Sequence, residues 1–264
     1  MPIYDEIART AAEFEQAAKI LASTTPVARI AMLYSQDSRW SIEQQRFSQD
    51  YDPVAVMKAW YRSFHARGLT VDVLPPDADL TSYALVLAPG LNVIDAPLAA
   101  RLDHYVHSGG HLVLGPRAGM KDRDNALWPH RQPGPLASLL GASVEDFYAI
   151  DAPVPLAGLE NATARIWAET LSPRSPDAHV LARYATTDGW LAGKPMAVTR
   201  RIFRGGITYI GGLLDDAGQA ALTEKLLAAS GLPPALLLPS GTRLRSGRVD
   251  RAAMRSSWIT RLRQ

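Results

Sequence analysis

The chain has 264 residues, of which 47% are hydrophobic and 20% charged, which is the composition of a globular protein with one large domain or a medium domain with appendages. It contains no cysteine, which excludes disulfides, thiolate metal sites and cysteine nucleophiles, and no apolar run of about 18 residues, which excludes a membrane-spanning helix. The net charge of +2 is uneven, because seven arginines and one acid after position 240 give that end +6 and leave −4 for the rest.

The N-terminal segment is predicted to be an amphipathic helix over residues 4–22, with Ile7, Phe14 and Leu21 among its regularly spaced apolar residues. The first residues lack the basic and apolar regions of a secretory signal, so a cytoplasmic location is expected.

Strands and helices then alternate at short spacing up to residue 114. We expect a strand at 28–34, a polar loop at 35–40, a helix at 53–67, strands at 70–74 and 83–88, a helix at 96–108 and a strand at 111–114. The alternation predicts an α/β fold with a doubly wound sheet and right-handed crossovers.

The second half of the chain changes its pattern. We expect a short helix from 134 to 141, extended segments at 144–150, 164–168, 179–184, 196–203 and 206–210, and a final helix at 216–230. Successive strands separated by Pro, Gly and Asp turns predict an antiparallel extension of the sheet.

The segment 111–122 is the most informative stretch, because a buried strand runs directly into a turn framed by Gly115 and Gly119. In enzymes of this architecture, the middle of such a corner holds a Ser or Cys nucleophile on a strained backbone. Here the middle residue is Arg117, which does not lose its proton at any useful pH. The corner therefore has the form of an active site without its reactive atom.

No catalytic carboxyl pair stands out. The neighbouring acids all lie beside turn residues, where capping and solvation are the expected roles. They are Asp77 with Asp79, Glu145 with Asp146, and Asp215 with Asp216.

No metal or cofactor site is predicted either. His104, His107 and His111 lack a carboxylate at a convincing spacing, so surface histidines are favoured over a zinc site. The paired glycines match neither a phosphate-binding loop nor a dinucleotide fingerprint.

Two clusters at apparent strand ends are the candidate binding or interface residues, because Arg and Trp often anchor protein interfaces. The candidates are Asp37, Ser38, Arg39, Trp40, Arg117 and Lys121. An equally weighted structural alternative is that Arg117 pairs with an internal acid such as Asp122. The arginine-rich end lacks interleaved aromatic residues apart from Trp258, so a disordered or incomplete segment is predicted there and nucleic acid is not expected as a partner.

Several stretches in series resemble the middle domain of the family-42 glycoside hydrolases, the bacterial β-galactosidases. The matching stretches, which keep the family's order over residues 28–232, are 33–34, 37–40, 71–73, 75–80, 85–89, 110–117, 121–122, 133–136 and 167–169. The resemblance implies a trimerisation domain with a flavodoxin-like fold related to the class I glutamine amidotransferases. That relationship would explain a nucleophile corner that has no nucleophile.

The chain departs from this family at both ends. The family's catalytic glutamates belong to a preceding (β/α)₈ barrel, which needs roughly 250 residues, so no catalytic glutamate is carried over. The resemblance divides the chain into 1–27, similar to the exit segment of a barrel, 28–235, the flavodoxin-like domain, and 236–264, similar to the truncated start of a β domain. We therefore expect a separated or truncated piece of a β-galactosidase.

The function implied is a non-catalytic assembly module, whose partners are two further copies in a homotrimer or a separate catalytic barrel. The alternative is a module that binds a sugar or small anion through Arg117, Lys121 and Arg39. An independent hydrolase would need carboxylates that the sequence does not supply.

Overall fold

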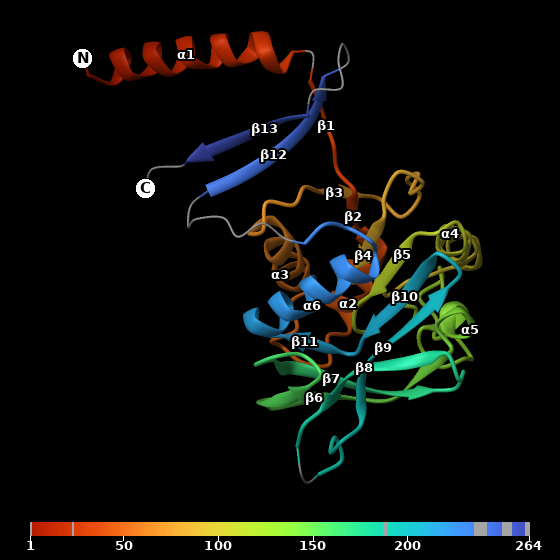
Figure 1. Ribbon diagram of the computed structural model, residues 1–264. Coiled ribbons are helices and arrows are strands. Elements are labelled where there is room, and N and C mark those ends of the chain that lie inside the picture. Colours follow the sequence, from red (N-terminus) through yellow and green to blue (C-terminus); the bar gives the residue numbers. More distant parts are fainter. Residues whose placement is uncertain (1, 23, 187–188, 235–241, 250–254, 262–264) are drawn as a thin grey trace.

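The computed structural model describes residues 2–22, 24–186, 189–234, 242–249 and 255–261. In this part of the chain, one ten-stranded sheet with helices on both faces forms the body, and one three-stranded sheet lies beside α1 (Figure 1). The helices are α1 (Pro2–Leu21), α2 (Gln36–Gln44), α3 (Pro53–His65), α4 (Ala96–His107), the 3₁₀ turn η1 (Gly134–Leu136), α5 (Ala137–Leu140) and α6 (Asp216–Ala229). The strands are β1 (Thr24–Pro26), β2 (Ile30–Leu33), β3 (Val71–Leu74), β4 (Leu85–Ala88), β5 (His111–Leu114), β6 (Ala142–Ala157), β7 (Thr163–Pro173), β8 (Ala178–Tyr184), β9 (Pro195–Ile202), β10 (Gly205–Ile210), β11 (Gly212–Leu214), β12 (Thr242–Val249) and β13 (Arg255–Arg261).

The first half of the large sheet is parallel, with strands in the order β3-β2-β4-β5-β10. Strands β2, β4 and β5 are buried along their whole length, which explains why their sequences read as unbroken apolar runs. Alternate residues face opposite sides: Ile30 and Met32 join the core under α3 and α6, while Ala31 and Leu33 join the core under α4 and α5. Figure 1 shows these two helix pairs on opposite sides of the strands.

The second half of the sheet is antiparallel, as predicted. Strand β9 pairs with β10, and the order continues through β8, β6 and β7 to β11. Because β10 pairs with the parallel strand β5 on its other side, the two halves form one continuous sheet. The sequence thus predicted the mixed α/β architecture and the positions of most elements.

The polar loop predicted at 35–40 is wrong, because the helix α2 begins there. Ser35 is its N-cap and accepts a hydrogen bond from the backbone N–H of Ser38 at 3.1 Å, and Arg39 pairs with Glu43 one turn later at 2.8 Å. Polar capping and a charged i, i+4 pair support this helix, and neither produces the apolar periodicity used in the prediction.

Strands also occupy much of the arginine-rich end, where a disordered or incomplete segment was predicted. In the described part of this end, β12 pairs with β13, and β1 joins β12 on its other side. The disordered alternative is therefore wrong for these strands, while the incomplete alternative stays a prediction. The alternating pattern of Arg with small or apolar residues in β12 fits a strand, but its β1 partner lies more than 200 residues earlier, beyond what local spacing reveals.

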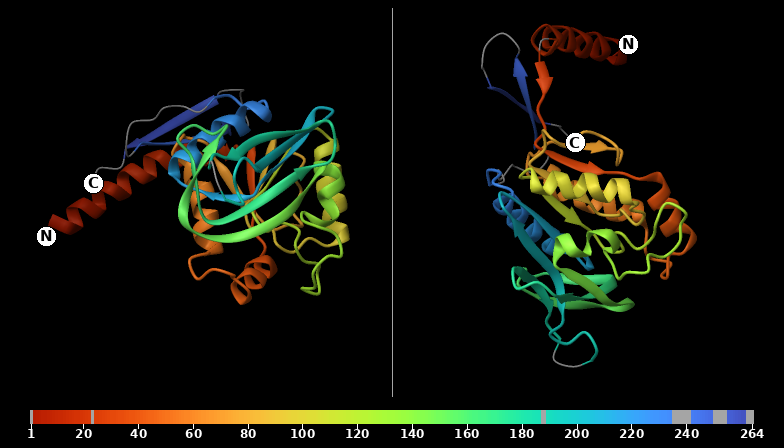
Figure 2. Two further views of the ribbon diagram at one scale, coloured as in Figure 1. Left: turned by 90° about the horizontal axis from the view of Figure 1, so that it is seen from below. Right: turned by 90° about the vertical axis from the view of Figure 1, so that its right-hand side faces the viewer.

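The helix α1 and the three-stranded sheet project from the body, as the views in Figure 2 show. No helix in the described ranges combines the length and apolarity needed to cross a membrane.

Candidate functional site

The corner after β5 has the strained backbone that the sequence indicated. Arg117 has a φ of 65°, in the left-handed region that residues with a side chain seldom adopt. The corner is also tightly packed, because a Cβ on Gly115 would lie 2.4 Å from the carbonyl oxygen of Pro89 at the end of β4. Strand ends therefore meet at this point, as in sites of open α/β sheets.

The Arg117 side chain points into the protein and is fully buried. Its terminal nitrogens donate hydrogen bonds to the carbonyl oxygens of Gln45 at 2.7 Å and Arg46 at 3.2 Å. The guanidinium carbon lies 5.0 to 5.5 Å from the ring centroids of Phe47, Tyr51 and Trp167, which form an aromatic cage around the cation.

Asp122 is not the internal partner that the structural alternative named for Arg117. Its carboxylate instead accepts hydrogen bonds from the backbone N–H groups of Asp124 and Ala126. The internal acid near Arg117 is Glu169 on β7.

Glu169 is fully buried beneath the corner, and its carboxylate accepts three hydrogen bonds. The donors are the backbone N–H of Arg117 at 2.9 Å, the indole N–H of Trp167 at 3.0 Å and the hydroxyl of Tyr209 at 2.7 Å. Burial raises the pKa of Glu169 to about 7, although these donors and the Arg117 charge favour the ionised form. Sequence reasoning did not select this residue as a site residue, although Glu169 stands in the stretch 167–169 that resembles the family.

Polar side chains of the protein itself are hydrogen-bonded to the corner. Asn92 donates a hydrogen bond to the carbonyl oxygen of Arg117 at 2.8 Å, and the hydroxyl of Ser41 lies 2.8 Å from the Asn92 side-chain oxygen and 2.6 Å from that of Asn125. Ser38 accepts a hydrogen bond from the backbone N–H of Val93 at 3.0 Å. This network fixes the corner against α2.

The six candidate residues separate into two groups. Ser38, Arg117 and Lys121 are buried, and burial together with the Arg117 charge lowers the pKa of Lys121. Asp37 and Trp40 are exposed on α2, whereas the partly exposed Arg39 pairs with Glu43 and donates a hydrogen bond to the Tyr34 hydroxyl. Arg117 directs its guanidinium at its own backbone carbonyls, so this arrangement does not favour the sugar or anion site.

The acid pairs largely have the capping roles that were predicted. Asp79 accepts hydrogen bonds from Thr81, and Asp215 is the N-cap of α6. Glu145 has a different role, since it pairs with Arg131 at 3.1 Å and Arg174 at 2.8 Å.

The histidines do not converge. His104 and His107 are exposed on α4, as predicted. The prediction of a surface position is wrong for His111, which is buried with a ring nitrogen 2.9 Å from the Thr208 hydroxyl. Within the described residues, no group of three or more His, Asp and Glu is placed to hold a metal ion.

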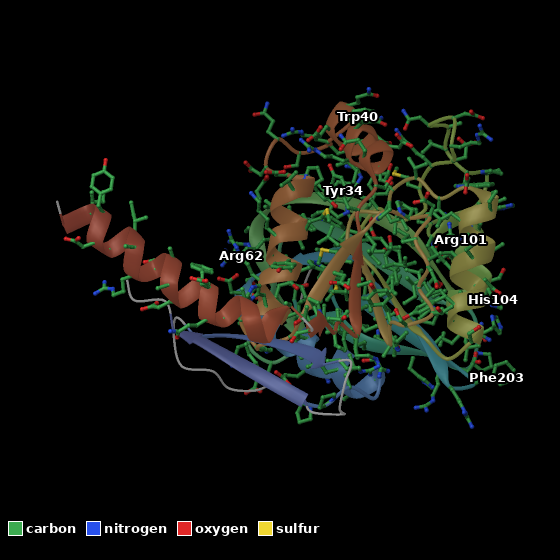
Figure 3. All side chains as sticks on the ribbon, turned by 90° about the horizontal axis from the view of Figure 1, so that it is seen from above. Tyr34, Trp40, Arg62, Arg101, His104 and Phe203 are labelled. Carbon is green, nitrogen blue, oxygen red and sulfur yellow. The ribbon has the colours of Figure 1, made fainter. Side chains whose placement is uncertain are left out.

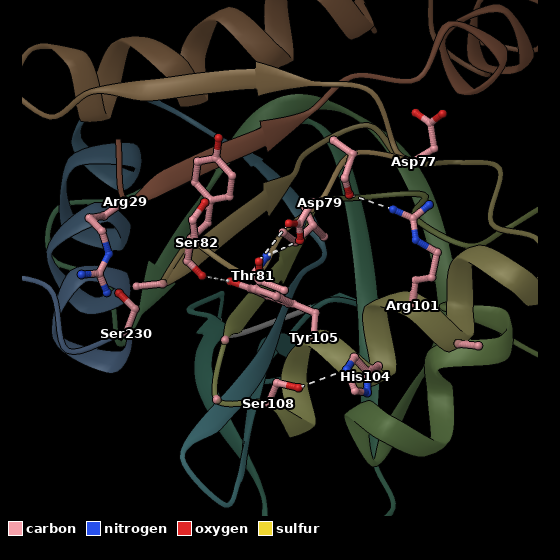
Figure 4. A pocket seen from close by; sticks show the side chains of 17 residues that line it. Arg29, Asp77, Asp79, Thr81, Ser82, Arg101, His104, Tyr105, Ser108 and Ser230 are labelled. Atoms are coloured by element: carbon pink, nitrogen blue, oxygen red, sulfur yellow. Dashed lines mark hydrogen bonds between the residues drawn. The ribbon is translucent and has the colours of Figure 1, made fainter. Parts of the chain in front are cut away.

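A cavity of about 780 Å³ lies at the opposite edge of the sheet, where strands β2, β4 and β5 begin (Figure 4). Several of its polar groups already have partners: Asp79 is bound to Thr81, and Arg101 donates a hydrogen bond to the carbonyl oxygen of Ala78 at 2.7 Å. The cavity is thus separate from the Arg117 corner.

Comparison with known proteins gives one family and a consistent set of relatives. Residues 28–233 match the family model of the "Beta-galactosidase trimerisation domain". The β-galactosidase Bga of Halorubrum lacusprofundi is 34% identical over 97% of this chain, and BgaH of Haloferax lucentense is 33% identical over 82%. The chain spans only 37% and 33% of the length of these two relatives.

Solved structures agree with the sequence matches. The β-galactosidase structure from Halorubrum lacusprofundi has a TM-score of 0.80 at 34% identity and covers 90% of this chain, which covers 35% of that one. The β-galactosidase from Bacillus circulans has a TM-score of 0.86 over 94% of this chain and 38% of its own, but at 21% identity it supports the fold alone.

Proposed function

Because this chain belongs to the family of β-galactosidase trimerisation domains, we propose that it is a non-catalytic assembly domain that brings three copies together. The observation that carries the proposal is the extent of the family match, since residues 28–233 include the whole ten-stranded sheet and its helices. In a complete enzyme of the β-galactosidase type, the hydrolysis of terminal β-galactosides would be carried out by another domain.

The parallel half of the sheet is of the flavodoxin-like type in this proposal. Numbered along the chain, its strands have the spatial order 2-1-3-4-5, which is the doubly wound order of that fold. The strained corner at Arg117 supports a relationship to enzymes that hold a nucleophile there, as in class I glutamine amidotransferases. Arg117 gives this position a structural role in place of a catalytic one.

The proposed partner of α1 is a catalytic barrel, in the same chain or in a separate one. The helix exposes Ile3, Tyr4, Ile7 and Phe14, and such a row of apolar side chains on a projecting helix suits packing against another domain. We accordingly assign 1–27 to the junction with a barrel, 28–235 to the assembly domain, and 236–264 to the start of a β domain. A cytoplasmic location stays a prediction.

Within the assembly domain, Asp37, Arg39 and Trp40 would contact a neighbouring copy from the outer surface of α2. Ser38, Arg117 and Lys121 would act from the inside, because they connect α2 to the corner and hold its orientation.

Light scattering of the purified chain over a range of concentrations tests this function. The expected result is a mass three times the 28.7 kDa of one chain, together with no turnover of a nitrophenyl galactoside. A mass of 28.7 kDa at every concentration would contradict self-assembly, and turnover of the galactoside by the pure chain would contradict the non-catalytic role.

A further inference from the structure

Two exposed phenylalanine side chains lie close together near the carboxyl ends of the parallel strands. Phe47, after α2, is 47% exposed, and Phe147, on β6, is 39% exposed. Their ring centroids are 5.7 Å apart, and Phe147 stacks at 5.4 Å and 19° on the buried ring of Trp167. We call Phe47, Phe147 and Trp167 the edge platform.

The platform is held in place from below by Arg117. Its guanidinium lies 5.0 Å from the Phe47 ring centroid, and its hydrogen bonds go to the carbonyl oxygens of Gln45 and Arg46, immediately before Phe47 in the chain. Phe47 itself has a φ of 62°, which is unfavourable for a bulky side chain. The protein therefore keeps a half-exposed aromatic ring in a strained position, and such rigid rings are well suited to anchor an interface.

The charges beside the platform fit a second copy of the same chain. Arg46 precedes Phe47 and Asp146 precedes Phe147, and both charged residues are exposed. In a closed ring of three, each contact joins two different strips of surface, one from each copy. A platform bordered by a positive and a negative residue meets this requirement, because the positive border of one copy can face the negative border of the next.

We propose that the edge platform is a contact surface between copies of this chain, with Phe47 and Phe147 as its anchors. This inference rests on the proposed assembly function and assigns that function to a specific surface. The exposed Trp40 lies on α2, seven residues before Phe47 (Figure 3).

The test measures, by sedimentation of the full chain, the concentration at which half of the chains are assembled. This concentration is compared between the wild type and the variants. Phe47→Ser combined with Phe147→Ser is expected to raise this concentration by about tenfold or more, as loss of interface anchors does. The control is Phe203→Ser, which removes a ring that is 82% exposed at the turn between β9 and β10, beside the amino ends of the parallel strands. The control is expected to assemble like the wild type.

A second variant covers the case in which the double substitution does not fold, as judged by far-ultraviolet circular dichroism. Phe147→Lys leaves Phe47 and the Arg117 cage intact, and it is expected to weaken assembly because it places a charge on the platform. A trimer that survives both folded variants overturns the assignment of the platform alone. A wild-type chain that remains at 28.7 kDa overturns the assembly function and this inference with it.

Discussion

At the scale of single residues, the corner is organised by two buried ionisable groups whose side chains do not bond directly to each other. Glu169 accepts the backbone N–H of Arg117, while the Arg117 guanidinium turns away to the carbonyl oxygens of Gln45 and Arg46. Each group is thus supported mainly by hydrogen bonds and aromatic rings. Removing one partner of such a network leaves buried polar groups unsatisfied, which costs more than the net contribution of the hydrogen bond.

Glu169 is expected to make the stability of the protein depend on pH. Its pKa rises from an ordinary value of 4.5 to about 7 on folding, so between these values the folded protein keeps a proton that the unfolded chain has lost. This contribution to the free energy of unfolding is present below pH 4.5 and is lost as pH rises through about 7. As pH rises across this range, the free energy of unfolding of the wild type is expected to fall by about 3 kcal/mol relative to that of Glu169→Gln. Denaturant unfolding of both proteins measures the difference.

His111 also makes stability depend on pH, in the opposite direction, and the comparison with Glu169→Gln cancels its effect. Burial lowers the pKa of His111 from 6.5 to about 4, so that its contribution grows as pH rises over the same range, and both proteins share it. Glu160→Gln is the matched control, because Glu160 is exposed. A wild-type minus Glu169→Gln difference that stays constant with pH would rule out a raised pKa at Glu169.

At the scale of elements, the ends of β4 and β5 are joined by close backbone contact. Gly115, which follows β5, leaves no room for a Cβ against Pro89, whereas a Cβ on Gly90 would meet nothing within 4 Å. The fold therefore requires a glycine at position 115, where a Cβ would clash, but not at position 90, where a Cβ would have room. The corner with Arg117 depends on Gly115.

Gly115→Ala is therefore expected to lower the free energy of unfolding by about 3 kcal/mol, because the added methyl group overlaps with main-chain atoms that cannot move independently. Gly90→Ala, one strand away, is expected to change it by less than about 0.5 kcal/mol. Urea unfolding of both variants measures the difference. Equal stability of the two variants would contradict the tight packing of the corner.

At the scale of the whole molecule, the parallel and antiparallel halves share one sheet and one corner. Strand β10 pairs with β5 on one side and β9 on the other, and the Arg117 corner of the parallel half is bonded to Glu169 of the antiparallel half. Both core clusters also contain residues of both halves, including Trp60 and Trp167 in one cluster and Val86 and Val144 in the other. The body is thus built as one cooperative unit, whereas α1 is exposed along most of its length.

Hydrogen exchange in increasing urea tests whether the two halves of the body unfold together. Peptides covering β4 and β7 are expected to open with the same free energy and the same urea dependence, because neither half keeps a complete core alone. The peptide of α1 serves as the internal contrast and is expected to exchange at much lower urea. Opening of β7 well before β4 would show that the two halves unfold separately.

The sequence alone determined the properties that depend on neighbouring residues. Buried strands, capped helices and the glycine-framed corner follow from local spacing, and the ordered series of matching stretches pointed to the family that was then confirmed. The tertiary structure decided what the corner does. The carbonyl partners of Arg117 lie 71 and 72 residues away and Glu169 lies 52 residues away, so no local pattern reveals them. The cage and the edge platform exist only because the sheet brings α2, β6 and β7 to one edge, where burial and hydrogen bonding fix each side chain.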